Sequence, residues 1–276
     1  LSLTTTGALI VSKPVTVTGT GNTISFVSGG DLTVSNVLTA PGDITLSALS
    51  GILTINTISG SSVAVTSSSG NITFRTKRFI NSFGSGALSA SSGKWQVWST
   101  NTSPFSGSTP DTYGALDYNY KQYNISYGTT PSGSGNGLLY SYAPTITVSG
   151  LQNVTKSYDG FLSITLASAN FSLSGVVDSD VLNMSSSSAV YSDAHVTTAN
   201  KTVSATGIAM NSATSSTGKS VYGYTLNNTT ANGSGTITAK SLTATATISG
   251  VNKVYDGYTV ATNSTVSGST SDGLNG

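Results

Sequence analysis

Short apolar alternations recur through the first third of the chain and constrain its fold more than any other feature. Alternation with a period of two residues, bounded by turn residues, is typical of β-strands. The segments, separated by Gly, Ser, Asn and Asp, are Leu9–Val11, Val15–Val17, Ile24–Phe26, Leu32–Val34, Ile44–Leu46, Leu53–Ile55, Val63–Val65 and Ile72–Phe74. Residues 1–93 are therefore predicted to form a series of short strands.

The spacing of these segments indicates how the strands stack. Asp31, Gly51 and Asn71 lie 20 residues apart, each directly before an apolar alternation, and Ile24 and Ile44 have the same offset. A fixed period near 20 with short strands indicates a solenoid, in which each turn buries its inner face against its neighbours. We therefore predict a right-handed parallel β-helix. The alternative is an antiparallel sandwich with hairpin turns at the Gly-Asp and Gly-Asn pairs.

The composition supports an all-β fold and excludes a binder steered by charge. Only 8% of the residues are charged, against about 25% in an average soluble domain. Val, Ile, Thr and Tyr dominate the apolar and semi-apolar positions, a bias that favours pleated surfaces. A formal net charge of +1 offers little for neutralising phosphates, so no nucleic-acid partner is expected. The one basic run, Arg75, Lys77 and Arg78, is interpreted as a solvated edge or turn.

Aromatic residues gather in the segment 94–142. An open β-helix end exposes apolar columns and unpaired edges, so it needs a cap, and large aromatics fit that requirement. The alternative is a carbohydrate platform, because Trp and Tyr faces also stack on sugar rings. The candidate ligand-binding aromatics are Trp95, Trp98, Tyr113, Tyr118, Tyr120 and Tyr123.

An internal repeat occupies the rest of the chain. The hexapeptide at 145–150 recurs in similar form at 245–250, and each copy is followed by a Tyr-Asp-Gly tripeptide. We predict a first small β module at 143–240 and the truncated start of a second at 241–276, each β-sandwich or β-grasp-like. The Asp before Gly suits a turn held by side-chain to backbone bonds. The motif residues with this structural role are Tyr158, Asp159, Gly160, Tyr255, Asp256 and Gly257.

These motifs resemble those of the large exoproteins of bacterial two-partner secretion, related to filamentous haemagglutinin. The similar stretches are Lys94–Ser99, Tyr123–Tyr127, Tyr140–Pro144 and the two Tyr-Asp-Gly contexts. The resemblance implies a β-helical shaft followed by tandem Tyr-Asp-Gly (YDG) modules. It also implies a place outside the cell or on the bacterial surface, and an outer-membrane secretion partner for the parent protein.

Few residues could carry chemistry, and we predict no catalytic residue, cofactor or metal. His195 is the only histidine and is expected on the surface, and there is no cysteine. A polysaccharide-cleaving β-helix would need paired carboxylates, whereas Asp31 and Asp43 are out of step with a 20-residue turn. Asp178-Ser179-Asp180 is interpreted as a solvated turn, with a contribution to a calcium site as the alternative.

The expected function is therefore mechanical: a stalk segment that spaces and displays an adhesive region. The main alternative is direct binding of host or environmental glycans or of surface proteins. A self-assembling filament subunit is a third. No apolar run approaches the length of a membrane span, so none is predicted.

Overall fold

The computed structural model of the chain describes residues 1–196, 199–249, 254–258 and 265–271. Strands and loops make up nearly all of this part, and its one helical element is the 3-10 turn η1 (Ser168–Asn170), so the all-β prediction is confirmed. The chain divides into two compact units. Unit 1 comprises Leu1–Ser149, Leu173–Ser185 and Ile208–Thr229, and unit 2 comprises Gly150–Ser172, Ser186–Gly207 and Thr230–Gly276.

Most strands of unit 1 are short. Those that lie wholly within it are β1 (Ser2–Thr5), β2 (Leu9–Val11), β3 (Val15–Thr16), β4 (Ile24–Ser28), β5 (Leu32–Val34), β6 (Leu38–Ala40), β7 (Ile44–Ile55), β8 (Val65–Ser67), β9 (Ile72–Asn81), β10 (Leu88–Ala90), β11 (Trp95–Ser99), β12 (Tyr120–Gln122), β13 (Gly137–Tyr140), β18 (Ser220–Tyr222) and β19 (Thr225–Leu226).

Four strands contribute residues to both units: the short β15 (Phe171–Ser174) and the longer β14 (Thr145–Ser157), β16 (Val181–Tyr191) and β17 (Lys201–Thr214). Three strands belong to unit 2 alone: β20 (Thr230–Thr238), β21 (Thr243–Ser249) and β22 (Thr265–Ser271).

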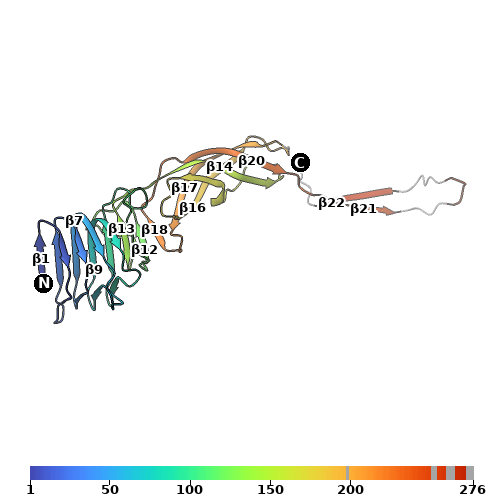
Figure 1. Ribbon diagram of the computed structural model, residues 1–276. Coiled ribbons are helices and arrows are strands. Elements are labelled where there is room, and N and C mark those ends of the chain that lie inside the picture. The colour runs from blue at the N-terminus through green and yellow to red at the C-terminus, as the bar shows by residue number, and fades with distance from the viewer. Residues whose placement is uncertain (197–198, 250–253, 259–264, 272–276) are drawn as a thin grey trace. The chain divides into compact units, whose positions relative to one another are not determined.

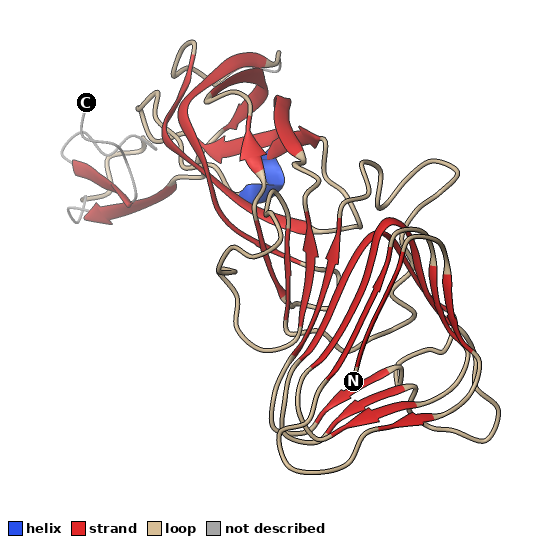
Figure 2. Cartoon of the chain, turned by 90° about the vertical axis from the view of Figure 1, so that its left-hand side faces the viewer, coloured by secondary structure: helices blue, strands red, loops and turns tan. Residues whose placement is uncertain are grey.

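Successive turns of the chain stack as parallel ladders in unit 1. The main ladder runs in the order β1-β4-β7-β9-β11-β13-β12, and each of these pairs is parallel (Figure 1). A second ladder, β3-β6-β8-β10, is also parallel throughout. In the rotated view the turns superpose, with flat strand runs joined by loops at the corners (Figure 2).

The inward positions of the main ladder form buried apolar columns. Phe26, Leu46, Phe74, Val97 and Leu138 lie opposite one another on successive strands, and all five are buried. Neighbouring strands are about 4.8 Å apart, so each side chain packs on the one above and the one below. The period-two alternation of the sequence is what places these residues on one face.

The register confirms one predicted offset and corrects another. Ile24 pairs with Ile44, as the 20-residue spacing predicts. The same spacing is wrong for Asp31, Gly51 and Asn71: Leu32 pairs with Leu53, which is 21 residues on, and Ile72 pairs with Ile44. The turn between β7 and β9 is longer than its predecessor, so it shifts the next strand out of a strict 20-residue period.

Glycines at the corners let successive turns approach closely. A Cβ added to Gly51 would lie 2.4 Å from the carbonyl carbon of Gly30 on the turn before, and one added to Gly70 would lie equally close to that of Gly42. Backbone atoms cannot yield to such a contact, so only glycine fits. The same close stacking applies at Gly42, where an added Cβ would lie 2.6 Å from the Gly21 carbonyl oxygen.

A strand from a distant part of the sequence covers the last rung of the main ladder. Tyr120 of β12 pairs with Ser220 of β18 in a parallel arrangement, and Lys121 pairs with Val221. β18 in turn pairs antiparallel with the end of β17, where Ala213 lies opposite Val221. The edge of β12 is therefore closed by backbone pairing, in addition to the aromatic packing that the sequence predicts.

Unit 2 is built around β20, which has a neighbour on each side. It runs parallel to β14, where Val154 pairs with Gly235, and antiparallel to β17, where Lys201 pairs with the same glycine. The Tyr191 hydroxyl donates a hydrogen bond to the Thr236 carbonyl at 3.0 Å. β21 and β22 form a separate antiparallel pair. Residues 250–253, 259–264 and 272–276 of the predicted second module lie outside the described residues.

Candidate functional site

A buried group of charged side chains is the most unusual feature of unit 1. The Lys121 ammonium lies 2.6 Å from Asp178 Oδ2 and 2.6 Å from Asp180 Oδ1. The side chains of Lys121 and Asp180 are fully buried, and that of Asp178 is 21% exposed. Transfer of charges from water into a protein interior is costly unless they are paired, and here one cation faces two anions.

Two tyrosines complete the hydrogen bonding of Asp180. The Tyr123 hydroxyl donates to Asp180 Oδ2 at 2.6 Å, and the Tyr224 hydroxyl donates to the same oxygen at 2.9 Å. Tyr224 also accepts a hydrogen bond from the Val177 N–H. Burial, followed by the negative charge of Asp180, raises the pKa of both tyrosines, so both remain protonated donors.

The local sequence explains how Lys121 comes to be buried. In a strand, neighbouring residues point to opposite faces. Tyr120 packs on one face of β12 against Trp98, Ile125 and Leu139. Lys121 points to the other face, where its ammonium lies 5.7 Å from the centroid of the Phe105 ring.

The ammonium keeps its proton in this surrounding. Burial by itself disfavours the charged form, but the hydrogen bonds and charges of Asp178 and Asp180 outweigh it and raise the pKa of Lys121 above its ordinary value. Burial also raises the pKa of Tyr140, whose ring centroid lies 5.8 Å from that of Tyr123. The surrounding is therefore aromatic and poor in water.

The turn at Asp178-Ser179-Asp180 is not the solvated turn that the sequence suggests. Asp178 and Ser179 adopt left-handed backbone angles, with φ of 51° and 55°, and the turn brings both carboxylates to one ammonium. The cation that these carboxylates meet is a lysine of the same unit. Lys121 was missed in the sequence because its partners lie 57 and 59 residues away.

Five of the six candidate ligand-binding aromatics are core residues. They have at most 6% of their surface exposed, and they are Trp95, Trp98, Tyr118, Tyr120 and Tyr123. This burial agrees with a role in capping and packing. Of the five, Tyr118 also lines a surface pocket.

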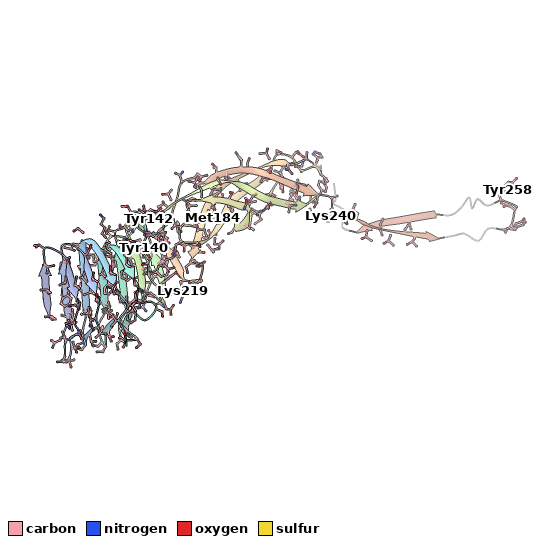
Figure 3. All side chains as sticks on the ribbon, in the orientation of Figure 1. Tyr140, Tyr142, Met184, Lys219, Lys240 and Tyr258 are labelled. Carbon is pink, nitrogen blue, oxygen red and sulfur yellow. The ribbon has the colours of Figure 1, made fainter. Side chains whose placement is uncertain are left out.

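The sixth aromatic, Tyr113, is half-buried beside a surface pocket. The pocket measures about 640 Å³, and Tyr113, Tyr118, Asp117 and Lys219 are among its lining residues. The two tyrosine rings meet edge to face, with centroids 5.8 Å apart. Lys219, labelled in Figure 3, is 3.0 Å from Asp117. An aromatic wall beside exposed polar groups could accommodate a small polar ligand.

The Tyr-Asp-Gly motifs form turns, as predicted. Asp159 Oδ1 accepts the Phe161 N–H at 3.0 Å, and Asp256 Oδ1 accepts the Tyr258 N–H at 2.9 Å. The motif glycine has a φ of +81° in the first motif and +83° in the second. Such backbone angles strongly favour glycine. Tyr158 is half-buried and its N–H donates to a carbonyl of β20, whereas Tyr255 is 94% exposed.

In the first motif the turn is also tied to a lysine. The Lys156 ammonium lies 2.7 Å from Asp159 Oδ1, and it donates to the carbonyls of Phe161 and Ser163. One side chain therefore satisfies two loop carbonyls and the motif carboxylate. The hydrogen bond from Lys156 holds the pKa of Asp159 below its ordinary value of 3.8.

We expect the substitution Lys156→Met to raise the pKa of Asp159 toward 3.8, because it removes the largest cause of the shift. Since the folded-state pKa is the lower one, the stabilisation is present above the unfolded value and is lost as the pH falls through the folded value. NMR titration of the Asp159 carboxyl measures its pKa in the wild-type chain and in Lys156→Met. An unchanged pKa in Lys156→Met would contradict the assignment, and Lys219→Met, which removes a lysine paired with Asp117, serves as the control.

His195 and the basic residues of β9 are the other polar residues that the sequence singles out. His195 has 87% of its side chain exposed and lies near Asp193. Within the described ranges, no three His, Cys, Asp or Glu residues are grouped closely enough to hold a metal ion. Arg75 and Lys77 are exposed on β9, and the Arg75 guanidinium lies 4.7 Å from the Tyr127 ring centroid. No helix among the described residues is long and apolar enough to cross a membrane.

These features define a class: an all-β chain with parallel strand ladders in one unit and Tyr-Asp-Gly turns in the other. Residues 142–232 match the family model of the YDG domain, a range that includes Tyr158-Asp159-Gly160. The chain therefore carries a YDG-type domain. No curated protein and no solved structure matches the sequence.

Proposed function

We propose that this chain is a structural stalk segment of a bacterial surface or secreted adhesin, which spaces and displays an adhesive region carried elsewhere in the parent protein. In this proposal residues 1–93 are the end of a shaft, 94–142 a junction, 143–240 a first YDG-type module and 241–276 the start of a second. The segment is not an enzyme, and its parent is exported by two-partner secretion to the cell surface or medium.

The observation that carries this proposal is the parallel ladder of unit 1. Backbone hydrogen bonds join each turn to the next, as in Leu38 N–H to Ala64 O and Val65 N–H to Ala87 O. Such bonds lie along the stacking direction, so a pull along the stack is shared by several bonds in each layer. Repeated layers of this kind make a stiff linear object, which is what a spacer requires.

We further propose that the ladders are the sides of a right-handed parallel β-helix. Consecutive parallel strands joined through a crossover are right-handed in nearly all proteins, because the strand twist favours that hand. The main ladder, the second ladder and a third parallel run through β2, β5, β7 and β9 are the arrangement that such a solenoid needs. For the YDG-type module, a β-sandwich and a β-grasp fold remain the two candidates.

A length-matched replacement tests the stalk function. Residues 94–240 of the parent are replaced by an unrelated rigid spacer of equal length, and adhesion of the cells is compared with that of cells carrying the intact parent. A spacer role predicts unchanged adhesion, whereas a deletion without replacement reduces it. Lost adhesion despite the equal-length spacer, with surface display still normal by antibody labelling, would refute the stalk function.

The pocket beside Tyr113 and Tyr118 favours direct glycan binding as a second candidate function. If it holds, the full chain binds oligosaccharides on a glycan array, and Tyr113→Ala abolishes that binding. Tyr127→Ala removes a partly exposed tyrosine outside the pocket and is the matched control. Absence of binding by the folded chain would eliminate this candidate.

A further inference from the structure

The stalk function makes no use of the reactive arrangement around Lys121. A primary amine, a fully buried carboxyl and a second carboxyl are held together in an aromatic surrounding, with both amine-to-oxygen distances at 2.6 Å. Phe105, Tyr123 and Tyr140 line this surrounding and contact one another ring to ring. An ordinary ion pair needs only one carboxylate for neutrality, and here the second leaves the group with an unbalanced negative charge.

We propose that Lys121 and Asp180 condense to an amide, forming an intramolecular isopeptide cross-link, with Asp178 as the group that transfers the proton. The reactants are two side chains of this chain, and the by-product is one water molecule. No oxidant, metal or cofactor is needed. The modification is autocatalytic and permanent.

The first step moves one proton within an existing hydrogen bond. The ammonium of Lys121 gives a proton to Asp180 Oδ1, which leaves a neutral amine, a neutral carboxylic acid and the carboxylate of Asp178. Two opposite charges are cancelled by this transfer, and a surrounding poor in water favours that cancellation. Because the ion pair is the more stable form, the neutral amine is a minor species and the reaction is slow.

The amine nitrogen then attacks Cγ of Asp180. The electrons of the carbonyl bond move to Oδ2, where Tyr123 and Tyr224 already donate at 2.6 Å and 2.9 Å. Donors fixed in advance at an oxygen that gains negative charge are a major source of catalysis. As the N–C bond forms, Asp178 Oδ2 takes one proton from the nitrogen, from which it lies 2.6 Å away.

The intermediate collapses by loss of Oδ1. The carbonyl bond to Oδ2 re-forms, the Cγ–Oδ1 bond breaks, and the leaving hydroxide takes the proton that Asp178 holds. Water departs, Asp178 is again a carboxylate, and the net charge of the group is the same before and after. The partial exposure of Asp178, at 21%, gives the water a route out on that side. The product amide keeps its oxygen bonded to the two tyrosine hydroxyls.

The cross-link would join β12 to the turn before β16 across 59 residues of sequence. Trypsin cleaves after Lys94, Lys121, Lys156 and Lys201. An acylated Lys121 is no longer a cleavage site, so the cross-linked chain yields residues 95–156 bonded to residues 157–201. The unlinked chain yields 95–121, 122–156 and 157–201 as separate fragments.

Intact-mass and fragment spectrometry of the purified full chain test the proposal. We expect a mass lower than the sequence mass by one water, and the linked fragment after denaturation and digestion. Dehydration at an Asp-Gly pair, as at Asp159-Gly160, also removes one water but leaves three separate fragments, and that result would overturn the proposal. The full sequence mass after several days in the folded state would overturn it equally.

Three variants separate the roles of the side chains. Lys121→Arg retains the positive charge and is expected to show the full sequence mass. Asp178→Asn and Tyr123→Phe keep both reactants, so they are expected to form the link more slowly than the wild-type chain. Near-ultraviolet circular dichroism checks that each variant is folded. Equal rates in the wild-type chain and both of these folded variants would contradict the assigned roles.

Discussion

Replacement of Lys121 by alanine is expected to lower the free energy of unfolding of unit 1 by about 3–5 kcal/mol, the usual cost of removing one partner of a buried ion pair. The substitution leaves Asp180 with no cation and Asp178 with little compensation. If the amide has formed in the wild-type chain, the loss is larger, because the variant also lacks the cross-link. Chemical denaturation monitored by tryptophan fluorescence measures the change, since both tryptophans lie in unit 1.

Lys219→Ala is the matched control for this experiment. Lys219 also pairs with an aspartate of unit 1, but its side chain is 36% exposed and that of Asp117 is 87% exposed. Exposed pairs contribute about 0–1 kcal/mol, so a small effect is expected. If the two alanine variants lost the same small amount, the Lys121 group would not be a major source of stability in unit 1.

Phe74→Ala is expected to have a comparable effect, of about 3–5 kcal/mol, by removing the middle of an apolar column. Phe74 is fully buried between Leu46 and Val97, and its ring lies 6.0 Å from that of Phe79. The column continues above and below the gap, and the paired backbones on both sides limit how far the turns can collapse into it.

Thr73→Ala tests whether this loss comes from the column. Thr73 is the neighbouring residue on the same strand and points to the other face, where it is only half-buried. Its replacement is expected to change the free energy of unfolding by about 0.5 kcal/mol or less. Equal effects at positions 73 and 74 would argue against the inward assignment of Phe74.

The sequence was a sound guide wherever a structural signal is local. Alternation with a period of two predicted the strands around Leu32 and Ile44, and Asp before Gly predicted both motif turns. These features depend on residues a few positions apart, so their physics is visible in a short window. The 20-residue offset succeeded for Ile24 and Ile44 because that turn contains no inserted loop.

The predictions that failed depend on distant residues. The Asp178-Ser179-Asp180 turn looks solvated in isolation, and only the fold brings Lys121 to it. The aromatics of segment 94–142 were predicted to form a cap, and the platform stayed open as the alternative because composition does not report which ring faces are covered. The low charge content of the chain was the one available indication of the Lys121 group, because every charged residue in such a sequence merits a search for its partner.

The pairing of β18 with β12 sets an order in which the chain can mature. The early rungs join neighbours about 20–30 residues apart, so each can form soon after its strand is available. The final rung needs Ser220, which is made 100 residues after its partner Tyr120. Contacts between distant residues form slowly, since a long loop must close first. If the chain emerges from a pore with its N-terminus first, the early strands therefore pair one after another as they emerge. The pairing of β12 with β18 forms last, after β18 has also emerged.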